Sequence, residues 1–261
     1  MLPDNACVVV AGGISSRFNE IVSNENVFNK TGGSGRALVK KEFMPLRVST
    51  DERTVLYFAV KPFLAVENMK AVVVVYAGDY KDETKRALSY LIKNSDIPFY
   101  FVKGGDTRQK SVLSGLKFLY EEMKMQVGLV SIHDGCRPYV TSQLIERVLA
   151  CAAQSGGAVP GVRVSDTLVK VREGKIMSFQ DREDVYAVQT PQCFFFPDIY
   201  FAHLNALTLD SGKNGSFRFT DDSSVYKKYG RDVSVTEGDR KNIKITYKSD
   251  LTDLGRIISD V

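Results

Sequence analysis

Residues 7–18 read CVVVAGGISSRF, and this stretch sets the expected fold. Its β-branched run, 8–10, predicts a strand that is buried on both faces of a sheet. The strand stops at Gly12 and Gly13, where the absence of a Cβ lets the backbone turn sharply and approach a ligand closely. Arg17 then adds a fixed cation, so the stretch predicts a phosphate-binding loop. Taken alone, it is equally typical of an ordinary glycine-rich turn with a solvated arginine.

Helical and strand patterns alternate through the first half of the chain. Short apolar runs predict three further buried strands, at 71–76, 98–102 and 127–132. Apolar residues at helical spacing predict helices over 54–66 (interrupted by Pro62), 80–93, 107–123 and 141–153. This order is typical of an α/β protein with a doubly wound, mostly parallel Rossmann-like sheet. Such sheets bind ligands at the carboxyl ends of their strands, where loops 12–17, 104–111 and 134–137 are expected.

The second half of the chain predicts shorter strands joined by turns. Strands are expected over 158–164, 167–171 and 175–179, with a turn at Glu173 and Gly174. This hairpin either folds back on the sheet or extends as an arm, at about 164–186, toward a second subunit. Later elements are expected at 199–209 (helix), 221–230 (short helix), 233–235 and 243–246 (strands) and 249–258 (helix). Because no internal repeat occurs, we expect one domain over 1–261.

Composition excludes several classes of protein. The 261 residues carry a formal net charge of +4 without a dense Lys/Arg tract, which favours an anionic small molecule over nucleic acid. The four cysteines are scattered without a C-x-x-C pair, so we expect reduced thiols and a cytoplasmic location. No signal peptide is evident at the N-terminus. No apolar run approaches the roughly 18 residues of a membrane span, so no membrane association is expected.

The familiar nucleotide and hydrolase motifs do not occur. The glycine loop fits neither G-x-G-x-x-G nor G-x-x-x-x-G-K-[ST], and no serine lies in G-x-S-x-G. Two histidines, His133 and His203, are too few for a multi-histidine metal site, and we expect His133 in a structural hydrogen bond at a strand end. The remaining candidates are cations and carboxylates without a nucleophile. That set favours phosphoryl or nucleotidyl transfer, in which the protein positions reactants and neutralises charge.

A triphosphate substrate would bring about four negative charges into the site. Neutralising them calls for Arg17, Lys41 or Lys244, usually together with Mg²⁺. Asp106 and Asp134 are candidates for contacts to metal, ribose hydroxyl or base, and no set of protein metal ligands is predicted. Each aspartate alone is as typical of a loop or helix cap, and each lysine alone is more typical of a solvated surface charge.

Residues 19–37 are mostly polar and small and show no periodicity. They predict a long loop beside the phosphate-binding stretch. Two interpretations stay open, a lid over the phosphate site and a tolerated surface insertion.

The chain carries seven motifs in order: Ala11-Gly12-Gly13-x-x-x-Arg17, Lys41-x-Phe43-x-Pro45-Leu46, Gly104-Gly105-x-x-Arg108-x-x-Ser111-Val112-x-x-Gly115-Leu116, His133-Asp134-x-x-Arg137-Pro138, Asp166-Thr167, Thr190-Pro191-Gln192 and Glu237-Gly238-x-x-x-Asn242-Ile243-Lys244-Ile245-Thr246. Together they resemble the 2-C-methyl-D-erythritol 4-phosphate cytidylyltransferase family of the non-mevalonate isoprenoid pathway. The resemblance implies a fold of the nucleotide-diphospho-sugar transferase type and a homodimer joined through the arm. It also implies Mg²⁺ bound mainly through the phosphates of CTP.

The resemblance assigns the nucleotide site. Arg17 and Lys41 would hold the CTP phosphates and stabilise charge at the α-phosphorus, with Lys244 beside them. The cytidine would be framed, largely through backbone groups, by Ala11, Gly12, Gly13, Gly105, Asp106 and Ser111. The family usually has a second glycine where this chain has Ser15.

The resemblance also assigns the site of the acceptor, a polyol phosphate. Asp134 would lie near the ribose and the acceptor hydroxyls. Arg137, Thr167 and Thr190 would line the acceptor pocket. Arg182 would reach into the neighbouring subunit and bind the acceptor phosphate.

Two other functions stay open. A ribitol-5-phosphate cytidylyltransferase, which forms CDP-ribitol, would share the fold and the CTP motifs; the form of residues 104–112 favours the methylerythritol enzyme. A catalytically silent nucleotide-binding regulatory protein is a different class. The joint presence of five charged residues argues against it: Arg17, Lys41, Asp134, Arg182 and Lys244.

Overall fold

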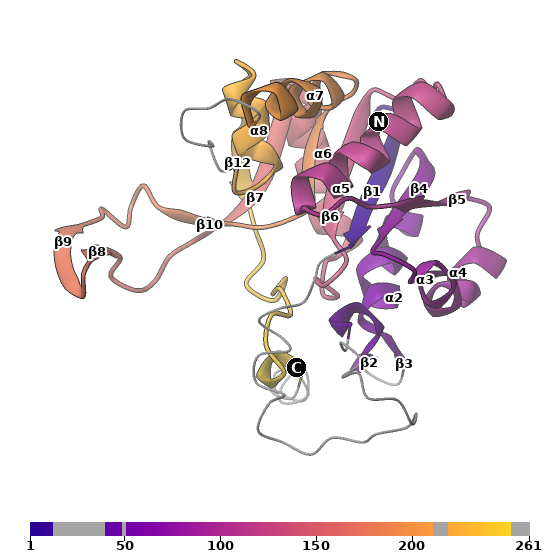
Figure 1. The fold of residues 1–261 in the computed structure, drawn as a ribbon, viewed down its shortest axis with the longest axis horizontal. Coiled ribbons are helices and arrows are strands. Elements are labelled where there is room, and N and C mark those ends of the chain that lie inside the picture. Colours follow the sequence, from indigo (N-terminus) through magenta and orange to yellow (C-terminus); the bar gives the residue numbers. More distant parts are fainter. Residues whose placement is uncertain (13–39, 49–50, 211–218, 252–261) are drawn as a thin grey trace.

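The structure is a computed structural model, and it describes residues 1–12, 40–48, 51–210 and 219–251. Four neighbouring strands of its main sheet run parallel: β6 (Leu129–Asp134), β1 (Asn5–Ala11), β4 (Met69–Tyr76) and β5 (Phe99–Lys103). Beyond β6 follow β11 (Gln192–Phe195), β7 (Gly157–Arg163) and β10 (Tyr186–Val188), each antiparallel to its neighbour. β12 (Ser234–Glu237) pairs in parallel with β7. The sheet thus has a mostly parallel core (Figure 1).

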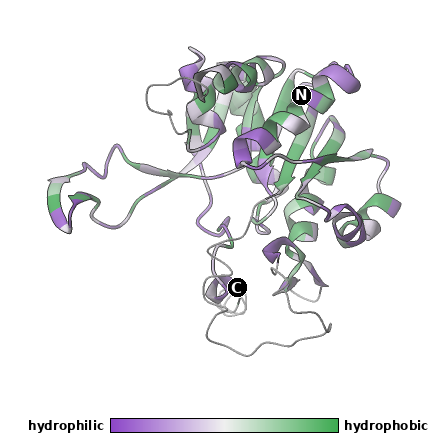
Figure 2. Ribbon diagram, viewed as in Figure 1, coloured by the Kyte–Doolittle hydropathy of each residue, from purple (hydrophilic) through white to green (hydrophobic). Residues whose placement is uncertain are grey.

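Helices cover both faces of this sheet and enclose two apolar cores (Figures 1 and 2). The first core is covered by α2 (Val55–Val60), the 3₁₀ helix η3 (Lys61–Ala65) and α6 (Ser142–Ser155). The second is covered by α5 (Arg108–Lys117), α7 (Asp198–Asp210) and α8 (Asp222–Lys228). Cys7 and Val9 of β1 pack into the first core, whereas Ala6 and Val8 pack into the second. This alternation confirms the predicted doubly wound α/β fold.

Three predicted helices are less regular than their periodicity indicated. The helix expected over 54–66 is α2 followed by η3, and Pro62 lies at the start of η3, as a missing N–H would favour. The helix expected over 80–93 divides at Leu88 into α3 (Lys81–Ala87) and α4 (Ser89–Lys93). The helix expected over 107–123 ends in a π-helical turn, η4 (Phe118–Glu122). Apolar spacing reports which face is buried, and it does not report such local breaks.

Two small hairpins stand apart from the main sheet. The 3₁₀ helix η2 (Lys41–Phe43) leads into β2 (Pro45–Val48), which pairs with β3 (Asp51–Thr54). The second hairpin, β8 (Val169–Arg172) and β9 (Lys175–Phe179), turns at Glu173 and Gly174, both at positive φ. It extends away from the sheet instead of folding back on it (Figure 1). We use "arm" for residues 164–186, which include this hairpin.

Some predictions fall outside the described residues, namely Gly13, Ser15, Arg17, the loop at 19–37 and most of the expected helix at 249–258. Within the described ranges, no helix combines the length and the apolar character that crossing a membrane requires.

Candidate functional site

Asp134 lies at the carboxyl end of β6, beside the end of β1, where Val10 is its partner in the ladder. Three cations surround its carboxylate. Arg108 Nε lies 3.1 Å from Oδ1, Lys244 Nζ lies 2.8 Å from Oδ2, and Arg137 Nε lies 3.7 Å from Oδ2. We call these four residues the Asp134 cluster. The sequence predicted its position at the edge where parallel strands end.

Burial gives the Asp134 cluster its electrostatic character. The side chain of Asp134 is 9 % exposed, and that of Arg137 is 11 % exposed. Burial raises the pKa of Asp134, but the charges of Arg108, Lys244 and Arg137 outweigh it and hold that pKa well below the ordinary value. Because three cations share one carboxylate, the cluster has an excess of positive charge. That charge can attract and orient an anionic ligand.

His133 and Thr190 form the polar layer beneath the cluster. The Asp134 N–H donates to Thr190 Oγ1 at 3.1 Å, and Thr190 Oγ1 lies 3.0 Å from His133 Nδ1. Burial lowers the pKa of His133 to about 4, so its ring is neutral at pH 7. The Thr190 hydroxyl therefore donates to Nδ1, and the protonated Nε2 faces the Arg137 carbonyl at 3.3 Å. The predicted structural hydrogen bond of His133 is confirmed.

Lys244 lies in a loop, not in the strand predicted over 243–246, and that prediction is wrong. The loop is fixed mainly by contacts other than a strand ladder. Arg137 Nη1 donates to the Asn242 carbonyl at 2.8 Å, and the Asn242 amide donates to the Thr190 carbonyl at 2.9 Å. The Lys41 ammonium donates to the Ile245 carbonyl at 2.7 Å. Lys41, which is buried, thus comes next to the segment that carries Lys244.

The two glycine loops at the strand ends meet at Ser111. A Cβ built on Gly12 would lie 3.3 Å from Ser111 Oγ, and one built on Gly104 would lie 2.7 Å from it. These close approaches explain why glycine occurs at both positions. The Ser111 hydroxyl donates to the Thr107 carbonyl at 2.8 Å, and Asp106 pairs with Lys110 at the exposed rim. The predicted Ala11, Gly12, Gly105 and Ser111 therefore belong to the same strand-end region.

Two predicted residues lie away from this region. Thr167 and Arg182 are both exposed on the arm. Among the described residues, no hydrogen bond or ion pair connects Thr167 or Arg182 to the Asp134 cluster. Their predicted contact with an acceptor stays a prediction.

Sequence reasoning missed three residues that the structure connects to the site. Arg108 belonged to a motif but received no role, although it contacts both Asp134 and Asp222. Asp222 and His203 are fully buried and lie 3.2 Å apart, from Oδ1 to Nε2. The pair Asp221-Asp222 predicted a helix cap, and Asp221 does cap α8. Nothing in the pattern indicated that Asp222 points inward to an arginine 114 residues earlier in the chain.

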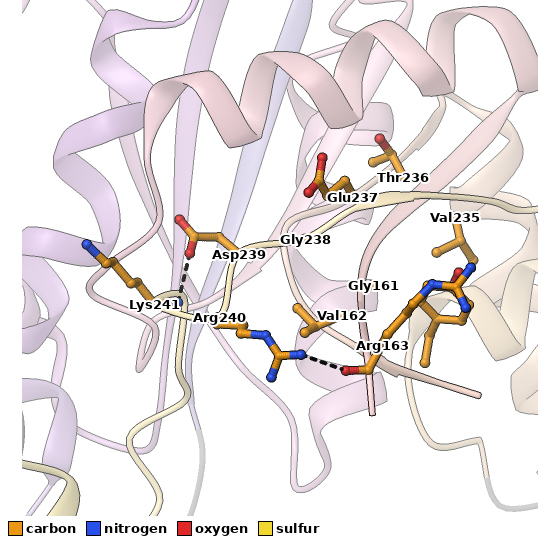
Figure 3. A pocket seen from close by; sticks show the side chains of 11 residues that line it. Gly161, Val162, Arg163, Val235, Thr236, Glu237, Gly238, Asp239, Arg240 and Lys241 are labelled. Atoms are coloured by element: carbon orange, nitrogen blue, oxygen red, sulfur yellow. Dashed lines mark hydrogen bonds between the residues drawn. The ribbon is translucent and has the colours of Figure 1, made fainter. Parts of the chain in front are cut away.

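A pocket of about 790 Å³ lies at the base of the arm, between the end of β7, the start of β10 and residues 235–241 (Figure 3). Its lining combines Arg163, Arg240 and Lys241 with Glu237 and Asp239, and Arg240 points to the Arg163 carbonyl. The cations and the acid Glu237 are exposed, so solvent screens them. The Asp134 cluster is more buried, so solvent screens its charges less, and it is the stronger candidate site.

The described ranges contain few side chains placed to hold a metal ion. They contain no group of three His, Cys, Asp or Glu side chains placed to hold one. Both oxygens of Asp134 already face cations.

Comparison with known families identifies the chain. Residues 26–259 match the family model described as "IspD: 2-C-methyl-D-erythritol 4-phosphate cytidylyltransferase". The chain belongs to this family. The match begins after the glycine loop, so membership does not depend on residues 11–17.

Curated members of the cytidylyltransferase family cover nearly the whole chain. The protein of that name from Clostridium botulinum (strain Langeland) is 32% identical over 95% of this chain and 94% of its own. The one from Thermosipho africanus is 32% identical over 86% of this chain and 93% of its own.

Solved structures of this cytidylyltransferase family share the fold. The 4-diphosphocytidyl-2C-methyl-D-erythritol synthase of Anaerococcus prevotii matches with a TM-score of 0.74 at 24% identity, over 98% of both chains. The cytidylyltransferase of Thermus thermophilus matches with a TM-score of 0.67 at 26% identity, over 98% of both chains. The predicted resemblance is confirmed.

Proposed function

We propose that this enzyme joins CTP and 2-C-methyl-D-erythritol 4-phosphate to give 4-diphosphocytidyl-2-C-methyl-D-erythritol and pyrophosphate, a step in isoprenoid precursor synthesis. Family membership supports the reaction. The structural observation that carries the proposal is the Asp134 cluster, a partly buried set of three cations around one carboxylate at the carboxyl ends of parallel strands. Phosphates of a nucleotide and an acceptor are the anions that such a site suits.

The chemistry needs charge and alignment more than a strong base. An oxygen of the acceptor phosphate attacks the α-phosphorus of CTP in line and forms a new P–O bond. The bond between the α-phosphorus and the bridging oxygen breaks, and its electron pair leaves with pyrophosphate. The acceptor oxygen is already anionic, so no proton has to be removed from it. The protein therefore lowers the barrier by positioning the reactants and stabilising the added negative charge.

Lys41, Lys244 and Arg17 are the proposed catalytic cations. The Lys41 ammonium uses one donor on the Ile245 carbonyl, which leaves donors for phosphate oxygens. Lys244 is paired with Asp134 at 2.8 Å, and this contact fixes its ammonium at the strand ends. We assign Arg17 by the family motif.

The remaining residues are assigned to the nucleotide, to the acceptor and to Mg²⁺. Asp134 and the glycine loops, with Gly13, Gly105, Asp106 and Ser111, would frame the cytidine and ribose. Arg137 and Thr190 would face the acceptor. Mg²⁺, bound mainly through CTP phosphates, would neutralise charge on the leaving pyrophosphate.

We further propose a homodimer in which the arm carries Thr167 and Arg182 to the partner's acceptor site. The support is the composition of the arm. Val171 and Ile176 are each 57 % exposed, and Phe179 is 69 % exposed, although the arm extends from the body (Figures 1 and 2). An exposed apolar hairpin is typical of a surface that another chain covers. We also assign the enzyme to the cytoplasm, since its four cysteines are free.

A release assay with a panel of acceptors tests the function. Pyrophosphate is measured from CTP with methylerythritol phosphate, with ribitol 5-phosphate and with neither. We expect release with methylerythritol phosphate and little with the other two. Faster release with ribitol 5-phosphate would assign the rival polyol, and no release with either acceptor would favour a silent nucleotide-binding protein.

A further inference from the structure

A line of polar side chains, buried except for the partly exposed Arg108, connects the second apolar layer to the Asp134 cluster. It begins at His203 on α7, continues through Asp222 at the start of α8 and Arg108 at the start of α5, and ends at Asp134. The joining distances are 3.2 Å, 2.7 Å and 3.1 Å. We call these four residues the Asp222 relay. Arg108 and Asp134 belong to the Asp134 cluster, whereas His203 and Asp222 do not.

Burying the Asp222 carboxylate costs free energy, because the charged group loses its hydration. Its side chain is fully buried, and burial alone would raise its pKa, but Arg108 and His203 lower that pKa to about 2. The carboxylate is therefore ionised at pH 7. Its oxygens are divided: Oδ2 accepts a hydrogen bond from Arg108 Nη2, whereas Oδ1 lies 3.2 Å from His203 Nε2 without hydrogen-bond geometry. A buried charge of this kind is weak evidence for stability, because a well-packed apolar group often serves as well.

The position of Asp222 is fixed from outside the relay. Asp221 caps α8 by accepting from the Ser224 N–H at 2.9 Å. Gln192 of β11 accepts from the Ser223 N–H at 2.9 Å and donates to Asp221 at 2.8 Å. The start of α8 is thus tied to the main sheet, so Asp222 offers Arg108 a fixed anchor.

Arg108 divides its guanidinium between two carboxylates. Nη2 is bound to Asp222, and Nε is bound to Asp134. The planar guanidinium has a fixed fork, so a carboxylate on one edge determines where the other edge points. Without Asp222, Arg108 would be free to turn both edges to Asp134 and to compete with Lys244 for its oxygens.

We propose that Asp222, aided by His203, is a positioning residue: it orients Arg108 so that Asp134 keeps Lys244 in its catalytic place. This inference rests on the proposed function, because Lys244 has a catalytic place only if the enzyme carries out the proposed reaction. Asp222 touches no substrate. Its role is to keep Arg108 from collapsing onto Asp134.

The test is a double-mutant cycle between Arg108 and Asp222. Asp222→Asn, which keeps the shape of the side chain, should lower kcat about tenfold, because small displacements of reacting groups are costly. The dissociation constant of CTP should stay within about threefold, since removing a negative charge does not weaken an anion site. In an Arg108→Gln background, Asp222→Asn should change kcat less than about twofold, because the anchor has nothing left to orient. An undiminished tenfold loss in that background would overturn the proposal.

Two additions separate this proposal from a purely structural role and from failure of the proposed function. His203→Gln keeps an amide donor and should retain more activity than His203→Leu; equal losses would contradict a part for His203 in the relay. The NMR chemical shifts of the Arg108 guanidinium hydrogens should change in Asp222→Asn, because the guanidinium turns and Nη2 loses Asp222. They should stay unchanged in the control Asp198→Asn, whose carboxylate binds Arg231. This readout needs no acceptor. Unchanged Arg108 shifts in Asp222→Asn would reject the relay even if turnover fails for other reasons.

Discussion

The Asp134 cluster and the arm use their side chains in opposite ways. In the cluster, one buried carboxylate contacts three cations, and backbone contacts from three distant segments fix its loops. In the arm, apolar side chains such as Ile176 and Phe179 stay exposed. The cluster is preorganised within one chain, whereas in the proposed dimer a second chain would cover the arm. This difference suggests that half of the proposed active site is built by folding and half by association.

The largest effect is expected from removing the centre of the preorganised half. Asp134→Asn leaves Arg108, Arg137 and Lys244 without their shared anion, so kcat/KM should fall about a thousandfold. The free energy of unfolding should drop by about 3 kcal/mol in urea titration, because partly buried cations lose their partner. Asp232→Asn removes an exposed carboxylate and should change neither quantity measurably. Near-normal turnover of Asp134→Asn would show that the cluster is only structural.

Replacing Lys41 tests the same preorganised half of the site, and we expect it to disturb the structure less than Asp134→Asn does. Lys41→Ala should lower kcat about a hundredfold, since it removes a preorganised charge from the triphosphate. Steady-state pyrophosphate release measures the effect. The matched control is Lys70→Ala, a lysine in a surface pair with Asp4, which should turn over normally. Equal rates for the two variants would show that Lys41 has no catalytic role.

Replacing Arg182 tests the half of the site that the proposed dimer would complete. Arg182→Ala should raise KM for the acceptor about tenfold, as the loss of a charged hydrogen bond does. The affinity for CTP, measured by calorimetry, should not change. Arg172→Ala on the same arm serves as control. If CTP affinity fell instead, the assignment to the acceptor phosphate would be wrong.

The smallest effect on turnover is expected from His133, whose ring supports the cluster from below. Its pKa in the folded protein is about 4, below the unfolded value near 6.5. As pH falls through this window the unfolded chain takes up the proton first, so stability declines from pH 6.5 to 4 and is unaffected above it. The contribution is at most about 3 kcal/mol. His133→Asn should remove this pH dependence in chemical denaturation, and a parallel pH profile for both proteins would contradict it.

The sequence predicted the fold well wherever burial leaves a mark on the side-chain pattern. Val8 to Val10 and the run at 71–76 are continuous apolar runs buried on both faces, the helix at 141–153 has apolar residues at helical spacing, and all three fall where expected. The segment 243–246 looked like a strand for the same apolar reason. Its backbone instead bonds to Lys41 and to the Cys136 carbonyl, partners that no local pattern reveals.

The candidate site was predictable where a single loop carries it. Asp134 could be placed at a strand end from motif and order, whereas nothing in the sequence connected Asp222 and His203 to it. Their connection to Arg108 spans 114 residues, and it depends on how α7 and α8 pack on the sheet. Sequence motifs identify groups that touch ligands, and they say little about the buried groups that hold those ligand contacts in place.

Subunit complementation tests the central claim most directly. Asp134→Asn and Arg182→Ala chains are mixed in equal amounts, exchanged, and assayed for pyrophosphate release from CTP and methylerythritol phosphate. If the arm completes the partner's site, each mixed dimer holds one site with both native residues. At acceptor concentrations well below the wild-type KM, activity should then rise from a few per cent to about a quarter of the wild-type value. Activity that stays at the average of the two separate variants would contradict a site shared between subunits.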